Sequence, residues 1–167
     1  MNPTDCIKVT TVLAVDPATA FEIFTEEVDA WWKHGPRYRF SVHRKGVMRF
    51  EPGVGGRLVE EYDGAVGDLF EVGRVLEWKP AECLAFEWRG RNFESGQVTR
   101  VEIRFEAVEA GTRVTLEHRG WDALPSDHPA RHGLGGEAFT SMIGLWWAEI
   151  LGSARAFAAN VEERNRR

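Results

Sequence analysis

Apolar and polar positions alternate with two different periods along the chain, and the change of period separates helices from strands. The segment CIKVTTVLAV, residues 6–15, mixes β-branched and polar residues in rough alternation, which predicts a strand. A helix is expected directly after it, because Asp16 is a favourable N-cap residue and Pro17 suits the first helical position.

The expected first helix carries one apolar face. Its apolar residues recur at spacings of three and four: Phe21, Phe24, Val28 and Trp31. Trp32 lies at the edge of this face, and HGP, residues 34–36, ends the helix or a close pair of short helices. A helix end is usually solvated, so two large indoles at this end need another explanation. We expect Trp31 and Trp32 to close one end of an internal pocket.

Between residues 37 and 120 the period changes to two, which is typical of half-buried antiparallel strands joined by short turns. YRFSV, residues 38–42, begins this pattern, and a glycine-rich turn is expected at residues 52–56. In CLAFEWR, Phe86 and Trp88 share one face. The clearest alternation assigns these residues to an inner face: Val101, Ile103, Phe105, Ala107, Val114, Leu116 and His118.

A polar, irregular loop is expected at residues 122–134, followed by a long helix with a continuous apolar face. That face comprises Phe139, Met142, Ile143, Trp146, Ile150, Ala154, Phe157 and Val161. The order is therefore β-α-β(6)-α, and we predict one α+β domain, residues 1–167, in which a curved antiparallel sheet wraps around the C-terminal helix. A wide sheet encloses one helix imperfectly, so a cavity between them is expected.

Composition and charge narrow the class of protein. The chain is 43% hydrophobic and 28% charged, an ordinary globular composition, and it lacks an apolar run long enough for a membrane helix. Its net charge of −5 argues against a nucleic-acid partner, because phosphate binding needs a basic surface. No secretory signal is evident, so a cytoplasmic location is expected. Cys6 and Cys83 have no partner spacing and are interpreted as buried, reduced thiols.

Three segments and a tryptophan-bearing last helix resemble the family of proteins homologous to the activator of the heat-shock-protein-90 ATPase. The segments are FEPGVGGRL, GRVLEWKPAECLAFEW and VEIRFEAVEAGTRVTLEHRGW. The likeness covers nearly the whole chain and is most specific at the Pro52, Gly55 and Gly56 turn and in residues 112–121. It implies the helix-grip fold of the START/polyketide-cyclase (SRPBCC) superfamily, with a cavity between sheet and helix and a link to the stress response. Such folds host binding, transport and catalysis alike, so no activity is fixed.

The chain departs from the family at one position of the last helix. The family usually has Gly-Trp where this chain has Trp146 before Trp147. A large ring in place of a glycine would make the expected cavity smaller.

Two polar residues of the predicted strands are candidates for chemistry. His118 could bind a ligand or act as a base, or it could be a structural histidine bonded within the core, and the second interpretation is favoured. Glu60 shares a face with Tyr62, but a register shift near the glycines would put Glu61 there instead. An exposed edge-strand glutamate is favoured over a desolvated carboxylate.

Other chemistries have little support in the sequence. His34, His128 and His132 lie in loops without metal-ligand spacing, so neither a metal nor another cofactor is expected. PGVGG lacks the Lys-Ser/Thr of a phosphate loop and precedes a strand. No nucleophile signature is present, and no catalytic residue is assigned.

The leading hypothesis is a small soluble binding protein that encloses a hydrophobic or aromatic molecule without performing chemistry. Its predicted ligand-binding residues are Trp31, Trp32, Phe86, Trp88, Phe105, His118, Met142 and Trp146. The alternatives are a chaperone partner, which the resemblance implies, and a cyclase, dehydratase or hydrolase that uses His118 with Glu60 or a tyrosine. The protein is expected to be a monomer or a homodimer.

Overall fold

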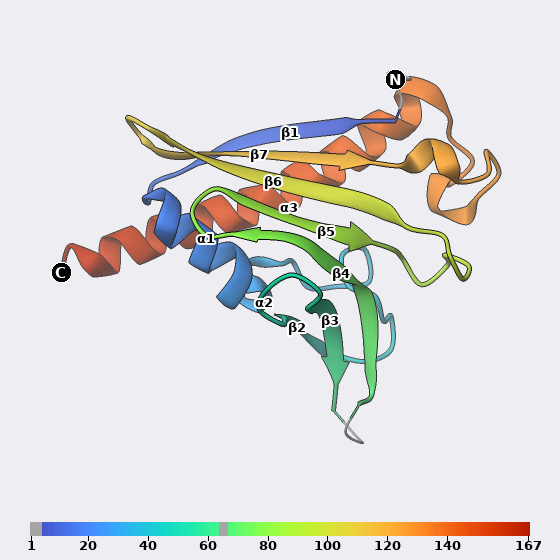
Figure 1. The fold of residues 1–167 in the computed structure, drawn as a ribbon, viewed down its shortest axis with the longest axis horizontal. Coiled ribbons are helices and arrows are strands. Elements are labelled where there is room, and N and C mark those ends of the chain that lie inside the picture. The colour runs from blue at the N-terminus through green and yellow to red at the C-terminus, as the bar shows by residue number, and fades with distance from the viewer. Residues whose placement is uncertain (1–4, 64–66) are drawn as a thin grey trace.

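The computed structural model describes residues 5–63 and 67–167, and it confirms the predicted α+β architecture. A curled sheet packs against one long helix, α3, and a pair of short helices covers one end of the sheet (Figure 1). The strands are β1 (Ile7–Leu13), β2 (Gly46–Phe50), β3 (Arg57–Tyr62), β4 (Leu69–Lys79), β5 (Cys83–Trp88), β6 (Thr99–Val108) and β7 (Gly111–Arg119). The helices are α1 (Pro17–Glu26), α2 (Val28–Trp31), the short 3₁₀ turns η1 (Trp121–Ala123) and η2 (Pro129–Arg131), and α3 (Gly136–Asn165).

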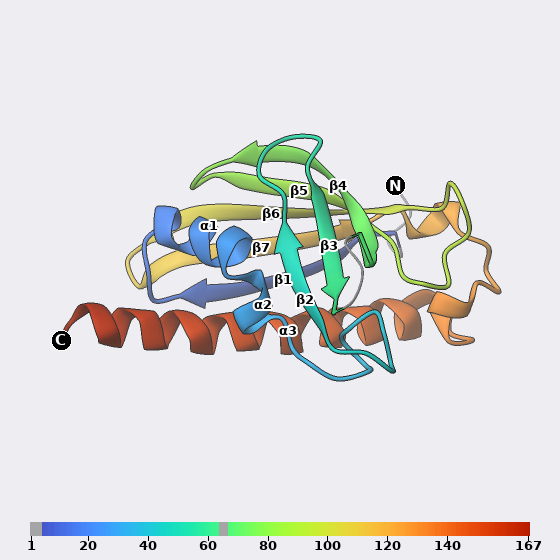
Figure 2. The same ribbon diagram turned by 90° about the horizontal axis from the view of Figure 1, so that it is seen from below.

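All strand pairs in the sheet are antiparallel, in the order β1-β7-β6-β5-β4-β3-β2. From β2 onward, each strand pairs with the next strand in the sequence. β1 pairs with β7 and forms the edge of the sheet opposite β2. Figure 2 shows α3 extending along β1 and β7, while β2 and β3 cross over toward the helix. This crossing makes the sheet concave around α3.

The curl comes from irregularities in β3 and β4. The register shifts at Leu58/Val59 between β3 and β4, and again at Val75/Glu77 between β4 and β5. Such bulges bend a strand and increase its twist. Gly73 lies at this bend, where an added Cβ would come within 1.8 Å of the Glu87 carbonyl oxygen. A glycine is therefore required for the close approach of β4 to β5.

The predicted start of the first helix is confirmed. The Asp16 carboxylate accepts a hydrogen bond from the Thr19 amide at 2.7 Å, and Pro17 is the first helical residue. The helix is a pair of short ones, because regular geometry is interrupted at Glu27. Trp31 ends the second of them.

The alternation of apolar and polar residues predicted the inner faces of β6 and β7 correctly, with one exception. The side chains of Val101, Leu116 and His118 are at most 1% exposed, whereas Ala107, near the end of β6, is exposed. The turn expected at residues 52–56 is also present, between β2 and β3.

The strand expected at YRFSV, residues 38–42, is wrong. These residues form turns and bends within the loop 32–45, called here the covering loop. In a strand, Val42 would share a face with Tyr38 and Phe40, but Val42 is 66% exposed and Phe40 only 9%, while Arg39, which would lie on the opposite face, is 8% exposed. Gly35, with φ of 103°, turns the chain before the segment can extend, and local alternation alone does not detect this.

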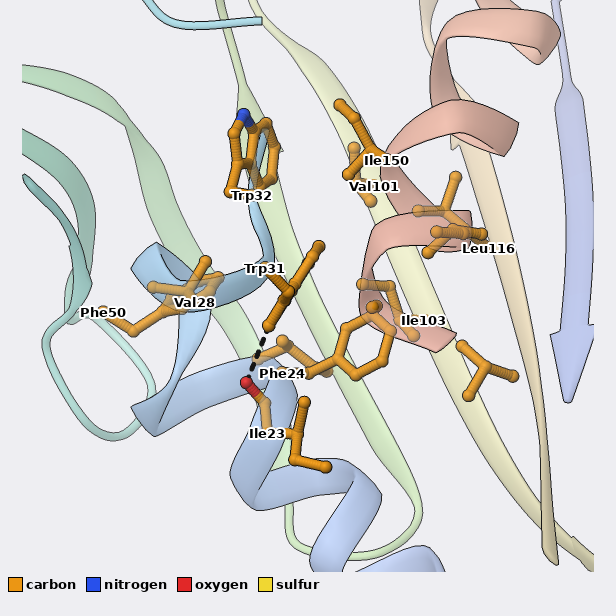
Figure 3. Packing of buried hydrophobic residues seen from close by; sticks show 14 of the residues in the cluster. Ile23, Phe24, Val28, Trp31, Trp32, Phe50, Val101, Ile103, Leu116 and Ile150 are labelled. Carbon is orange, nitrogen blue, oxygen red and sulfur yellow. Dashed lines mark hydrogen bonds between the residues drawn. The ribbon is translucent and has the colours of Figure 1, made fainter. Parts of the chain in front are cut away.

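The core lies between the inner face of the sheet, the helix pair and α3. Trp147, Ile150, Leu151 and Ala154 of α3 are at most 1% exposed and meet residues of the sheet and of α1 and α2. Figure 3 shows Trp31, Trp32 and Phe24 in this core beside Ile103 and Leu116, with the Trp31 indole N–H donating to the Ile23 carbonyl at 2.8 Å. Within the two described ranges, no helix is both long and apolar enough to cross a membrane.

Both cysteines are free thiols. Cys6 is half-buried, and Cys83 is buried and lies 3.2 Å from a carboxylate oxygen of Glu77. Burial and this neighbouring charge raise the pKa of the Cys83 thiol to about 11. The thiol therefore stays protonated near neutral pH and is a poor nucleophile.

Candidate functional site

A cavity of about 690 Å³ lies between the covering loop, the end of β5, the η1–η2 segment and the first half of α3. Its volume is within the range of small-molecule sites. The apolar part of its wall consists of Phe40, Trp88, Trp121, Met142, Ile143 and Trp146. The residues that follow β5, including Gly90 and Arg91, form part of its rim.

Four of the predicted ligand-binding residues line this cavity: Trp88, His118, Met142 and Trp146. They come from β5, β7 and α3, so the fold brings together residues that lie up to 58 positions apart in the sequence. Trp88 packs against Trp146 with 6.1 Å between ring centroids, and against His118 at 5.3 Å. These side chains therefore form one continuous wall.

The other four predicted residues, Trp31, Trp32, Phe86 and Phe105, are not part of that wall. They are 1–7% exposed within the packed core. The hollow that remains beside Trp31, Trp32 and Phe86 is only about 10 Å³, which is too small for a ligand. Direct ligand contact by these four residues stays an untested prediction.

Trp32 does not line the cavity itself, but it contacts residues that do. Its indole N–H donates to the carbonyl oxygen of Tyr38 at 2.9 Å, and its ring packs on Trp146 and Trp147 at 6.0 and 5.6 Å. Both contacts place Trp32 behind the residues that face the cavity. The indole of Trp32 therefore supports the rest of the covering loop from the core side.

The covering loop is fastened to α3 by aromatic and polar contacts. The Tyr38 ring stacks on Trp146 with 6.3 Å between centroids, and the Tyr38 hydroxyl donates to the Glu149 carboxylate. The Trp146 indole N–H donates to the Arg37 carbonyl at 2.9 Å. The hydrogen bond from Tyr38 lowers the pKa of Glu149, so the carboxylate stays ionised at neutral pH. Together these contacts close the cavity on the side of α3.

Arg39 anchors the covering loop from its buried side. The sequence pattern did not predict this role. Its guanidinium forms an ion pair with Asp29 at 2.7 Å and donates to the carbonyls of Trp32, Lys33 and Gly46 at 2.7, 3.1 and 3.3 Å. Its side chain is 5% exposed. Such a buried charge is tolerated only when its donors are satisfied, as they are here.

His118 is held on both ring nitrogens. The Trp147 indole N–H donates to Nδ1 at 3.0 Å, so Nδ1 must be the acceptor nitrogen. Nε2 lies 2.7 Å from the hydroxyl oxygen of Thr99, whose own proton goes to the Trp88 carbonyl at 2.8 Å. Nε2 therefore carries the proton of a neutral imidazole.

Burial lowers the pKa of His118 to about 3. A proton added to Nδ1 would meet the indole N–H of Trp147, and the lone pair that a general base needs is already engaged. This geometry fits the structural interpretation of His118 and gives no support to the acid–base one.

The register of β3 resolves the choice between Glu60 and Glu61. Glu60 faces inward and is 0% exposed, so the favoured exposed position is wrong for it, whereas Glu61 pairs with Arg49 at the surface. One carboxylate oxygen of Glu60 accepts from the Phe40 amide at 2.9 Å, and the other has no hydrogen-bond partner within the described part of the chain. A side chain at Gly46 would collide with Glu60, so the glycine makes room for it. Glu60 ties the covering loop to β3.

The loop histidines do not gather into a metal site. His34 contacts Arg39, and buried His128 bonds the Gln97 side chain at 2.9 Å and the Ala130 amide at 3.1 Å. His132 is exposed at the rim of the cavity. Among residues 5–63 and 67–167, no three His, Cys, Asp or Glu side chains are arranged to hold a metal ion.

Several cavity residues were not selected from the sequence. Trp121 is 0% exposed and packs between Trp88 and Phe139, with centroids 5.9 and 5.0 Å away. Its position at the end of the TRVTLEHRGW strand was the available signal. Arg91 lies in an irregular segment, where periodicity assigns no face, and Tyr38 and Phe40 lie in the segment that the sequence pattern assigned to a strand.

Comparison with known proteins gives a family and a fold. The family model described as Activator of Hsp90 ATPase homolog 1-like protein matches residues 14–143. A search of curated proteins found no match.

Solved structures resemble the chain over most of its length. Protein NE0264 from Nitrosomonas europaea is 15% identical, with a TM-score of 0.65 and coverage of 98% of this chain and 99% of that one. The Aha1 dimer from Colwellia psychrerythraea is 18% identical, with a TM-score of 0.58 and coverage of 90% and 92%. CalU16 from Micromonospora echinospora is 16% identical, with a TM-score of 0.57 and coverage of 91% and 73%. At these identities the likeness establishes the fold.

Proposed function

This chain belongs to the family of Activator of Hsp90 ATPase homolog 1-like proteins, and from that premise we propose that it is a binding protein for an apolar or aromatic small molecule. The molecule is enclosed between the end of β5, the covering loop and α3. The observation that carries the proposal is the cavity of about 690 Å³ with its wall of indole rings.

The driving force for binding is desolvation. Trp88, Trp146 and Met142 offer apolar surface to a ligand, and burying ~200 Å² of ligand apolar surface contributes about 5 kcal/mol before the entropy of association is subtracted. The contacts of Tyr38 and Arg37 in the covering loop with Glu149 and Trp146 of α3 would close the site over the ligand. Binding of this kind needs no reacting group.

Catalysis with His118 has less support. Both ring nitrogens of His118 are engaged inside the protein, and Glu60 lies behind Phe40 without lining the cavity. A general base must have a free lone pair within reach of its substrate. The geometry thus favours binding over an enzymatic role.

The proposal is tested with N-phenyl-1-naphthylamine, a neutral aromatic probe whose fluorescence rises in apolar surroundings. Met142→Trp places a large ring inside the cavity, so we expect the probe affinity to fall roughly tenfold or more. The matched control is Leu145→Trp, one turn further along α3, where the side chain is 64% exposed, and it should bind like the original protein.

Equal probe affinity in both variants and the original protein would contradict the proposal, and so would the absence of any probe binding by the original protein. If Met142→Trp fails to fold, Ala130→Leu fills the same cavity from its opposite wall. Native mass spectrometry of freshly purified protein would then identify a co-purified ligand by its added mass.

A second candidate function is partnership with a chaperone of the Hsp90 class. The family description and the likeness to the Colwellia psychrerythraea Aha1 dimer favour it. The test is the ATPase rate of the chaperone with and without this protein. A stimulated rate would support this second function, and an unchanged rate together with probe binding would favour the first.

A further inference from the structure

The charge around the cavity is opposite to that of the chain. Among the described residues, the cavity is lined by three arginines, by His43, His132 and the neutral His118, and by no aspartate or glutamate. The chain as a whole has 26 acidic and 21 basic residues. A cleft lined by one sign of charge concentrates ligands of the other sign. The lining therefore selects for an anion, although the protein is itself an anion.

Two of the three arginines are already neutralised within the protein. Arg39 pairs with Asp29 at 2.7 Å, and Arg37 lies 3.7 Å from the Glu149 carboxylate. Arg91 differs from both. Within the described ranges it forms no ion pair with a carboxylate, and its single hydrogen bond is the one that it donates to the Tyr62 hydroxyl at 2.8 Å.

The Arg91 guanidinium is nevertheless held in place. Its central carbon lies 5.0 Å from the centroid of the Phe70 ring and 5.5 Å from that of Tyr62. Cation–π contacts and one hydrogen bond orient the group without cancelling its charge. The remaining N–H donors are thus available in the planar arrangement that binds carboxylates and similar oxyanions.

The tryptophan side of the cavity wall is aromatic. The rings of Trp88, Trp121 and Trp146 form a connected group with neighbouring centroids 5.9 and 6.1 Å apart. The indole N–H groups of Trp88 and Trp121 are buried, and neither has an acceptor in the part of the chain that the structure describes. These buried N–H groups are out of a ligand's reach, so the wall offers its ring surface to an aromatic ligand, and an anionic end suits the Arg91 guanidinium.

We propose that the cavity binds an aromatic or polycyclic acid, whose ring system packs on the tryptophan wall and whose single anionic group binds Arg91. This inference rests on the proposed binding function and names the class of ligand. It assigns Arg91 as the residue that determines specificity.

The experiment compares two probes that differ by one charge. 1-Anilinonaphthalene-8-sulfonate is N-phenyl-1-naphthylamine with an added sulfonate, so the ratio of their dissociation constants isolates the anionic group. The ratio is measured for the original protein, for Arg91→Gln and Arg91→Lys, and for the control Arg155→Gln. Arg155 is exposed on α3, about two turns beyond the last cavity residue of that helix.

We expect Arg91→Gln to weaken binding of the sulfonate probe roughly tenfold and to leave binding of the neutral probe within about twofold. Arg91→Lys should retain part of the preference, since it keeps the charge and loses the planar donors. Arg155→Gln should match the original protein. Added salt should weaken only the sulfonate probe.

An unchanged ratio in Arg91→Gln would overturn the anion proposal, while binding of the neutral probe would leave the proposed function standing. If neither probe binds the original protein, the proposed function fails first and this inference fails with it. Far-ultraviolet circular dichroism of each variant verifies that the fold is retained.

Discussion

The two ends of the space between the sheet and α3 are both rich in aromatic rings, but only one end is filled. At the end covered by α1 and α2, Phe24 and Trp31 pack with centroids 4.7 Å apart and leave a hollow of about 10 Å³. At the other end Trp88, Trp121 and Trp146 surround about 690 Å³. Aromatic content therefore does not distinguish a core from a cavity.

The difference lies in what covers the concave face at each end. A helix pair fills the first end, because its apolar face inserts four large side chains, Phe21, Phe24, Val28 and Trp31, toward the sheet. The second end is covered by a loop, whose Tyr38 stacks on Trp146 of α3 and whose Phe40 stacks on Phe70 of β4. A loop can close a space without filling it, and this leaves room for a ligand.

The largest effect is expected at the filled end. Trp31→Ala should lower the free energy of unfolding by about 3–5 kcal/mol, because it removes a buried indole and leaves a void in the core. The matched change at the cavity wall is Trp146→Ala. It should cost about 1–2 kcal/mol, since its side chain is only partly buried.

Urea denaturation of both variants provides the measurement. Equal losses would mean that the cavity end is packed as tightly as the helix end, which would remove the basis of the comparison.

An intermediate effect is expected where the covering loop is anchored. Arg39→Ala should destabilise the protein by about 2–3 kcal/mol, because it leaves the Asp29 carboxylate and three carbonyls without their buried donor. Arg37→Ala is the control two residues earlier. The Arg37 side chain is 62% exposed, so no measurable loss is expected. Thermal unfolding tests both, and similar midpoints for the two variants would show that the loop is not held by Arg39.

The smallest effect concerns His118, on the wall that separates the two ends. Burial lowers the pKa of His118 to about 3 in the folded protein from its ordinary value of 6.5, so the unfolded chain takes up the proton first as the pH falls. Stability that is present above pH 6.5 is therefore lost progressively on acidification. Between pH 6.5 and 5 this loss should be about 1.5 kcal/mol.

His118→Gln should be less stable than the original protein at neutral pH but should lack this part of the pH dependence. Chemical denaturation at pH 5, 6 and 7.5 measures the slope for both proteins. An unchanged slope in the variant would mean that His118 can be protonated in place, which would return it to the list of possible bases.

Much of the fold was predictable because it follows from local sequence patterns. The Asp16 cap, the alternation of β6 and β7 and the apolar face of α3 each follow from residues close in sequence, and the resemblance supplied the same topology. The site was less predictable. Half of the proposed ligand-binding residues line the cavity, and the segment 38–42 was assigned to a strand although it forms turns and bends.

The sequence by itself determined most of the strands, the apolar face of β6 and β7, and that one long helix must cover the sheet. Period and capping are properties of neighbouring residues, so they need no knowledge of the rest of the chain. Only the tertiary structure decided which aromatic residues meet one another and which face an open space. That outcome depends on the bend at Gly73, on the short length of α1 and α2, and on the anchoring of the covering loop by Arg39. The bend brings β4 against β5, and Arg39 links residues that lie outside one regular element, so the period of a single helix or strand carries no information about either contact.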